Sequence, residues 1–139
     1  MFTAKVYKVM VGSLSGTMEE VFAAKETIRK WNVENAESTG KLYMPIDWSA
    51  NSNGVQDVDV VIGIVGNWVE NTGVIEDRIN KLMHVMLLFN TYHDPYNSIC
   101  SEQDGVREFK RLMQDHCFCA EYGSLAELNE LLNAELRTI

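Results

Sequence analysis

Apolar residues recur along the chain in two patterns: short, nearly continuous runs typical of buried strands, and longer stretches with helical spacing. The short runs are rich in β-branched residues and end at glycine or polar turn residues. We expect strands at 5–13, 42–46, 58–66, 83–89 and 117–122, and helices at about 17–31, 74–82, 104–116 and from 124 onward. This alternation predicts an α/β fold with a parallel sheet and right-handed crossovers.

Two of the expected helices begin with a capping-box pattern, in which a hydroxyl residue precedes a glutamate by three positions. We expect Thr17 to accept a hydrogen bond from the backbone N–H of Glu20, and Ser124 to do the same for Glu127. The apolar positions predicted to face the core are Met18, Val21, Ala24, Ile28 and Trp31, then Val106, Phe109, Leu112 and Met113, then Leu125, Leu128, Leu131, Leu132 and Leu136.

The strand order follows from two of the runs. Pro45 lacks the N–H that a central ladder needs, so its strand belongs at an edge, whereas the apolar run over 58–66 is typical of a strand covered on both faces. The predicted structure is a single domain over 1–139, a three-layer flavodoxin-like fold with five parallel strands in the order 2-1-3-4-5. In that order the loops after Ser13 and Gly66 flank the topological switch point, where α/β sheets bind ligands.

Composition excludes several classes of function. The net charge of −8 argues against a nucleic-acid partner, and no apolar run is long enough to cross a membrane. The odd set of three cysteines in an acidic chain points to reduced thiols and a cytoplasmic protein. Cys117 and Cys119 follow His116, but their spacing is unlike that of zinc sites, so we expect small apolar core residues and no metal.

Polar and aromatic residues gather at the two loops that flank the switch point. The small-residue turn could hold a phosphate or carboxylate through backbone amides and the helix dipole, or it could be an ordinary turn with an N-cap. The tryptophans could stack on a base or nicotinamide ring, or they could cap the core. The candidate ligand-binding residues are Ser13, Ser15, Gly16, Thr17, Trp48, Gly66, Asn67 and Trp68.

Glu76 lies on the helix expected after the third strand. One carboxylate suffices to cleave a ribosyl bond to a cationic base such as nicotinamide, because the base leaves as a neutral molecule and the carboxylate stabilises the positive charge that develops on the ribose. The alternative is an exposed helix glutamate with no role in catalysis.

Several segments, taken in order, resemble a bacterial and phage TIR-like domain family of unknown function, and the resemblance covers nearly the whole chain. These segments are 7–13, 18–20, 28–32, 47–49, 59–64, 85–89, 107–110 and 122–125. Such families are similar to TIR domains and nucleoside deoxyribosyltransferases, which share the flavodoxin-like arrangement. These proteins often use a glutamate after the third strand to act on N-ribosyl bonds of NAD or nucleosides.

The resemblance implies that the chain binds a nucleotide-type small molecule, with NAD or a related nucleotide as ligand or substrate. Because the segment 71–77 resembles a compressed form of the glutamate segment, it also implies that Glu76 is the catalytic carboxylate. The alternative is a catalytically inactive interaction or oligomerisation module, phage or prophage encoded, that assembles with itself or with a TIR-type protein.

Overall fold

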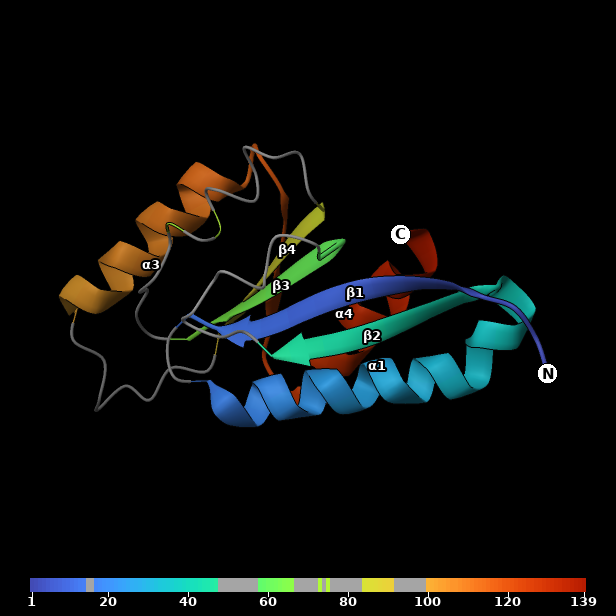
Figure 1. The fold of residues 1–139 in the computed structure, drawn as a ribbon. Helices are drawn as coiled ribbons and strands as arrows, with labels where there is room; N and C mark the ends of the chain where they lie inside the picture. The colour runs from blue at the N-terminus through green and yellow to red at the C-terminus, as the bar shows by residue number, and fades with distance from the viewer. Residues whose placement is uncertain (15–16, 48–57, 67–72, 74, 76–83, 92–99) are drawn as a thin grey trace.

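The computed structural model describes residues 1–14, 17–47, 58–66, 73, 75, 84–91 and 100–139. Its five strands form one parallel sheet in the order β2-β1-β3-β4-β5 (Figure 1). In chain order the elements are β1 (Lys5–Ser13), α1 (Met18–Thr39), β2 (Lys41–Asp47), β3 (Val60–Val65), β4 (His84–Asn90), α3 (Cys100–Met113), β5 (Phe118–Tyr122) and α4 (Leu125–Thr138). The predicted flavodoxin-like α/β fold and its strand order are therefore confirmed.

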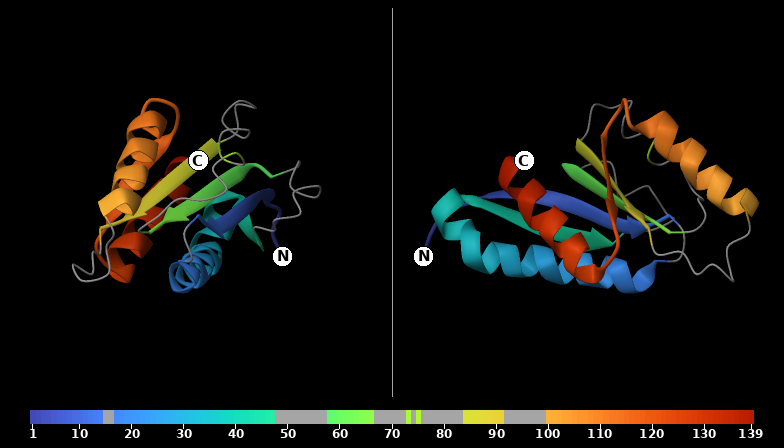
Figure 2. Two further views of the ribbon diagram at one scale, coloured as in Figure 1. Left: turned by 90° about the vertical axis from the view of Figure 1, so that its left-hand side faces the viewer. Right: turned by 180° about the vertical axis from the view of Figure 1, so that it is seen from behind.

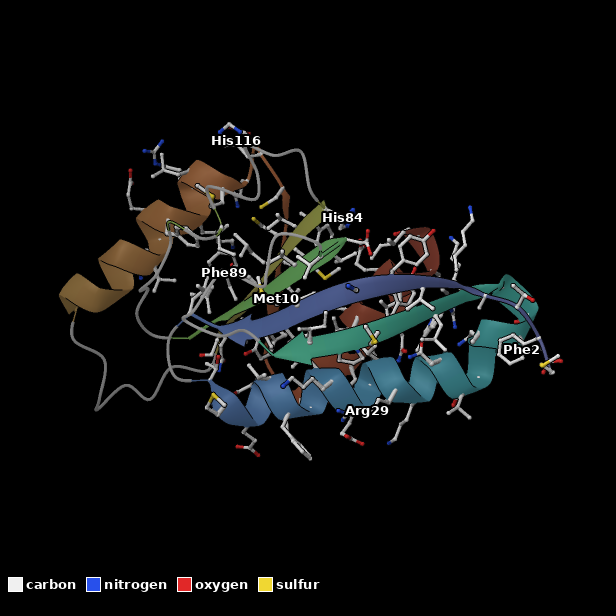
Figure 3. The ribbon with its side chains drawn as sticks, in the orientation of Figure 1. Phe2, Met10, Arg29, His84, Phe89 and His116 are labelled. Atoms are coloured by element: carbon white, nitrogen blue, oxygen red, sulfur yellow. The ribbon has the colours of Figure 1, made fainter. Side chains whose placement is uncertain are left out.

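Helices cover both faces of the sheet and give the molecule three layers (Figure 2). On one face α1 and α4 pack against each other, and their core comprises Val9, Val11, Ile28, Trp31, Ile62, Ile64, Leu88, Leu128, Leu132 and Leu136. On the other face α3 covers a second cluster, in which Phe89 of the sheet packs against Phe109 of the helix, with ring centroids 6.3 Å apart (Figure 3). All six residues of β3 are buried, as a strand covered on both faces requires.

The edge position predicted for β2 is confirmed. Side chains form hydrogen bonds with backbone groups on the outer side of this strand. The Asn32 amide donates to the Tyr43 carbonyl at 2.6 Å, and its oxygen accepts from the Tyr43 N–H at 2.9 Å. The Lys41 N–H donates to the Thr39 hydroxyl at 3.3 Å, and Pro45 has no N–H to offer. The edge is thus closed to pairing with another strand at these positions.

Three apolar residues expected in the core are exposed instead. Met18 and Leu125 are 69% and 37% exposed, because each is the first residue of its helix and projects past the core that the helix covers. Leu112 is 48% exposed, since successive helix residues point about 100° apart and its neighbour Met113 faces the core. The other positions predicted for the stripes of α1 and α4 are buried or partly buried.

Three helix boundaries differ from the expected ones, and the first is the end of α1, which lies at Thr39 rather than near 31. α3 begins at Cys100 rather than near 104, because a polar first turn gives no apolar signal, and it ends at Met113, whose carbonyl accepts from the N–H groups of His116 and Cys117. At α4 the capping prediction is confirmed: Ser124 Oγ accepts from the Glu127 N–H at 3.1 Å. The helix expected over 74–82 lies outside the described residues, apart from helical Ile75.

Candidate functional site at the carboxyl edge of the sheet

The strand order places the switch point of the sheet between β1 and β3. The chain leaves β1 toward β2 on one side, whereas β3 lies on the other side of β1 and leads to β4. The connections that follow β1 and β3 therefore run in opposite directions from neighbouring strand ends. In sheets of this kind the crevice beyond those two carboxyl ends is where ligands bind.

Three of the predicted site residues lie together at this edge. Ser13 pairs in register with Ile64, two residues before Gly66, and the N–H of Leu14 donates to the Ile64 carbonyl at 2.9 Å. Thr17 returns to the same point. Its N–H donates to Ser13 Oγ at 2.6 Å, and its hydroxyl lies 2.9 Å from Ser13 Oγ and 3.3 Å from the Ile64 carbonyl oxygen. A hydroxyl pair thus links the end of β1 to the start of α1.

This hydroxyl pair corrects the capping prediction for Thr17. α1 does begin after Thr17, but the Thr17 side chain makes no capping hydrogen bond to the helix, because its hydroxyl is directed to Ser13 and Ile64. The N–H groups of Leu14 and Thr17 are also engaged within the protein. A phosphate at this turn would have to use other amides.

The charges near this helix start also oppose an anion. Glu19 and Glu20 lie in the first turn of α1, where a carboxylate interacts favourably with the positive end of the helix dipole. Two negative charges at that position repel a phosphate group. Neutral hydroxyls and acidic side chains suit a sugar, or a ligand with positive charge, better than a phosphate.

Side chains pack closely around Gly63 of β3, directly below the carboxyl edge of the sheet. A Cβ atom at Gly63 would lie 2.9 Å from Leu87 Cδ2, 3.3 Å from Leu14 Cδ1 and 3.5 Å from Ile75 Cδ1. Glycine therefore lets these three side chains converge on the middle of β3. Ile75, completely buried, anchors the chain beside Leu14 immediately before the predicted catalytic position.

The remaining predicted site residues lie outside the described residues: Ser15, Gly16, Trp48, Asn67, Trp68 and Glu76. Sequence reasoning missed the contributions of Leu14, Ile64 and Gly63. The apolar character of Leu14 and Ile64 gave no hint that their main chains build the edge. The i, i+4 spacing of the hydroxyl residues Ser13 and Thr17 was the signal available for the pair.

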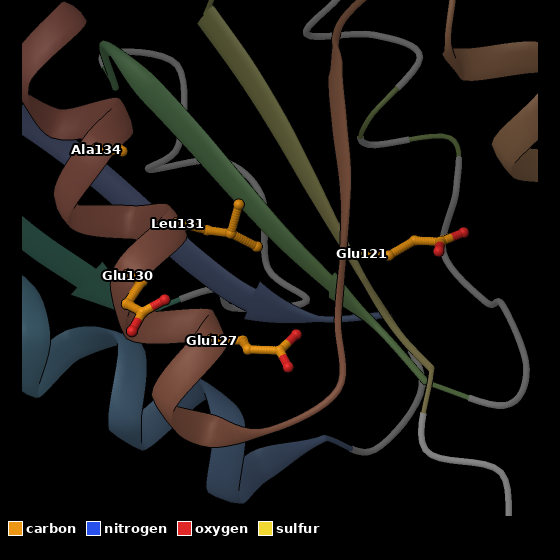
Figure 4. Close-up of a pocket in the computed structure, with 5 residues that line it drawn as sticks. All are labelled: Glu121, Glu127, Glu130, Leu131 and Ala134. Carbon is orange, nitrogen blue, oxygen red and sulfur yellow. The ribbon is translucent and has the colours of Figure 1, made fainter.

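A cavity of about 510 Å³ lies elsewhere, between β5 and α4 (Figure 4). It is lined by Glu121, Glu127, Glu130, Leu131 and Ala134. Glu127 is partly engaged, since its carboxylate accepts from the Gly123 N–H at 2.9 Å. The three carboxylates repel a phosphate group. None of the predicted site residues lines this cavity.

Within the described ranges no group of three or more His, Cys, Asp or Glu residues is arranged to hold a metal ion. None of the helices described is long and apolar enough to cross a membrane.

Comparison with known proteins supports the fold. No protein-family model matches the chain, and no curated protein matches it. Among solved structures, it is similar to the G-domain of FeoB from Methanococcus jannaschii, with a TM-score of 0.51 and 15% identity over 96% of this chain and 97% of that one. It is also similar to a short-chain flavodoxin associated with a PDU bacterial microcompartment, with a TM-score of 0.49 and 10% identity over 99% of both chains. At these identities the first likeness concerns the fold alone.

Proposed function

We propose that this domain binds a nucleotide-type small molecule at the carboxyl edge of the sheet, between β1 and β3. The observation that carries the proposal is the parallel order β2-β1-β3-β4-β5, since it creates a switch point at the ends of these two strands. The free thiols of Cys117 and Cys119 fit a protein of the reducing cytoplasm.

The ribose end of the ligand is the part best suited to the described residues. Ser13 is half-buried, and its hydroxyl can exchange hydrogen bonds with a sugar hydroxyl, whereas Glu19 and Glu20 disfavour a phosphate at the same helix start. A cationic base such as nicotinamide is compatible with the acidic first turn. NAD, bound with its nicotinamide riboside toward α1, would place a sugar near the hydroxyl and a cationic base near the acidic first turn.

The proposed reaction is cleavage of the N-ribosyl bond, with Glu76 as the carboxylate that stabilises positive charge on the ribose. Support comes from the resemblance to TIR-like domains and from the position of Ile75, whose buried side chain reaches Leu14 and Gly63 beneath the edge. The chain next to Glu76 is thus anchored close to the end of β1.

Nicotinamide release from NAD tests the reaction. We expect Glu76→Gln to lower the rate by about 100-fold or more, the usual effect of losing a group that stabilises transition-state charge. Glu37→Gln is the matched control, because Glu37 is an exposed glutamate near the far end of α1. Equal rates for the two variants, or no turnover by the wild type at high enzyme concentration, would rule out the reaction.

Binding is tested separately by thermal unfolding with NAD, ADP-ribose and flavin mononucleotide. A ligand that binds only the folded chain raises Tm as its concentration exceeds Kd. We expect stabilisation by NAD and ADP-ribose. An unchanged Tm with all three ligands would contradict nucleotide binding, whatever the outcome of the NAD cleavage assay.

A second candidate function is self-association through the outer face of α1, and the exposure of its apolar residues favours it. Met18, Phe22 and Val33 are exposed, at 66% for Phe22 and 87% for Val33. Between them lies the ion pair of Glu26 and Arg29, and Arg29 points away from the body of the molecule (Figure 3). These five residues form one stripe, since they follow each other at intervals of three or four positions.

The stripe is complementary to a second copy of itself. Antiparallel packing of two α1 helices about the centre of the stripe places Met18 opposite the second copy's Val33. It also places Phe22 opposite the second copy's Arg29, where a guanidinium can lie over the ring. Each contact then occurs twice, as an isologous dimer requires.

Sedimentation equilibrium tests this candidate. We expect a concentration-dependent dimer in the wild type and a monomer for Phe22→Glu. Leu112→Glu is the matched control, because Leu112 is also an exposed helix residue but lies on α3. A wild-type chain that remains monomeric, or equal loss of the dimer in both variants, would exclude α1 as the interface.

A further inference from the structure

Two free cysteines come together where the chain passes from α3 into β5. Cys117 lies in a bend directly before β5, and Cys119 lies within it, paired with Leu87 of β4. Their Sγ atoms are 4.0 Å apart, and both residues are half-buried at the margin of the second core cluster. Alternate residues of an extended chain share a face, which explains why both sulfurs lie on the same side.

The surroundings shift the pKa values of the two thiols in opposite directions. The hydrogen bond from the Cys117 thiol lowers the pKa of Cys119, and the Lys110 ammonium lowers it further, against the opposing effect of burial. The same hydrogen bond, together with burial and the negative charge of Cys119, raises the pKa of Cys117. Lys110 is held nearby by an ion pair with Glu121 and by the ring of Phe89. Of the two thiols, Cys119 is therefore the one that loses its proton more readily.

The single proton of the Cys117 thiol has two acceptors within reach. One is Cys119 Sγ, and the other is the Met113 carbonyl oxygen, 3.6 Å from Cys117 Sγ at the end of α3. The Cys117 N–H donates to the same carbonyl at 3.1 Å. The main-chain bond keeps Cys117 in place while its thiol turns toward Cys119.

We propose that Cys117 and Cys119 are a thiol–disulfide exchange site for low-molecular-weight disulfides of the glutathione type. Two sulfurs 4.0 Å apart on half-buried residues are the arrangement that reacts with such disulfides in two steps.

In the first step the Cys119 thiolate attacks one sulfur of the disulfide. The S–S bond of the reagent breaks, a mixed disulfide forms on Cys119, and one thiolate leaves and takes a proton from water. Cys119 is then no longer a thiolate that accepts a hydrogen bond from Cys117, so the largest cause of the raised Cys117 pKa is lost. Cys117 gives up its proton to solvent and attacks Cys119 Sγ, and the second thiolate leaves. The two cysteines lose two electrons, and the reagent disulfide gains them.

The product is a disulfide between residues two apart, which is a tight ring. Cα atoms two residues apart on a strand are separated by up to about 6.8 Å, the upper end of the range that disulfides tolerate. Cys117 lies in a bend rather than in the strand, so the ring can close by rotation there without distorting β5. A strained bond of this kind is readily reduced again.

The test treats the folded protein with oxidised glutathione and follows its intact mass and the peptides that carry each cysteine. We expect the wild type to lose two hydrogen atoms and form the Cys117–Cys119 disulfide. Cys117→Ser should stop at a stable glutathione adduct on Cys119. Cys119→Ser should react at position 117 about tenfold more slowly or worse, because the thiol whose pKa is lowered by its surroundings is then absent.

Cys100→Ser is the control and should leave the reaction unchanged. A wild-type chain that keeps both thiols free would overturn the proposal, as would one that accumulates a permanent glutathione adduct or reacts first at Cys100. Circular dichroism of each serine variant verifies the fold, and restoration of the original mass by dithiothreitol verifies reversibility.

Discussion

At the scale of single residues, the Ser13–Thr17 hydroxyl pair holds the start of α1 against the end of β1. Thr17→Val keeps the shape of the side chain but removes its hydroxyl, which contacts Ser13 Oγ and the Ile64 carbonyl oxygen. We expect a loss of about 1 kcal/mol in the free energy of unfolding, because the Ile64 carbonyl retains the N–H of Leu14 as a partner.

Urea unfolding measures this loss, and Thr17→Ser serves as the control, since it keeps the hydroxyl. Destabilisation by serine but not by valine would mean that the Thr17 methyl group, and not its hydroxyl, matters at this position.

Two buried tyrosines should respond in opposite ways to loss of the hydroxyl. The Tyr43 hydroxyl donates to the Leu136 carbonyl at 2.9 Å, in the last turn of α4, where helix carbonyls lack partners within the helix. Tyr122 is 1% exposed, and its hydroxyl has no hydrogen-bond partner among the residues described. Burial and the charge of Glu20 raise the Tyr122 pKa, which keeps that hydroxyl neutral.

We therefore expect Tyr43→Phe to lower the free energy of unfolding by about 1–2 kcal/mol, and Tyr122→Phe to leave it unchanged or raise it by up to about 1 kcal/mol. Paired urea titrations measure the difference. Comparable losses in both variants would show that the Tyr122 hydroxyl has a partner in the folded protein.

At the scale of elements, Asn32 of α1 forms hydrogen bonds with β2, the edge strand of the sheet. Its side-chain amide satisfies both the N–H and the carbonyl of Tyr43, in place of a neighbouring strand. We expect Asn32→Ala to lower the free energy of unfolding by about 1–3 kcal/mol and to increase aggregation, because it opens the β2 edge.

Asn35→Ala is the control for this prediction. The Asn35 amide donates to the Trp31 carbonyl within α1, at 3.1 Å, and not to β2, so among the described residues its loss leaves the edge closed. Denaturant titration and light scattering on both variants make the comparison. Equal aggregation of the two variants would contradict a protective role for Asn32.

The apolar pattern predicted elements well where burial is regular along the chain. The run over 58–66 and Pro45 were sufficient to place the central and edge strands, because those two environments select different residues. The pattern failed at Met18, Leu112 and Leu125. The exposure of Met18 and Leu125 depends on where each helix begins relative to the core, and that of Leu112 on which side of α3 faces the sheet. Both are properties of the packed elements rather than of local spacing.

At the scale of the whole molecule, the location of the candidate site could be predicted because it follows from strand order. Ser13, Thr17 and Gly66 do lie at one edge. The sequence could not show whether the Thr17 hydroxyl bonds to the Glu20 N–H as a cap or to Ser13, because both bonds use the same hydroxyl. The Ile64 carbonyl of β3 lies beside that hydroxyl in the folded chain and favours the bond to Ser13.

An NMR titration of the ¹⁵N-labelled domain with NAD tests the central claim most directly. Nucleotide binding between β1 and β3 predicts that the amide resonances of Ser13, Leu14 and Gly66 shift as NAD is added. Those of Lys5, at the opposite end of β1, and of Glu127, beside the acidic cavity, should stay unchanged. An unaltered spectrum at millimolar NAD, or shifts confined to the cavity between β5 and α4, would contradict it.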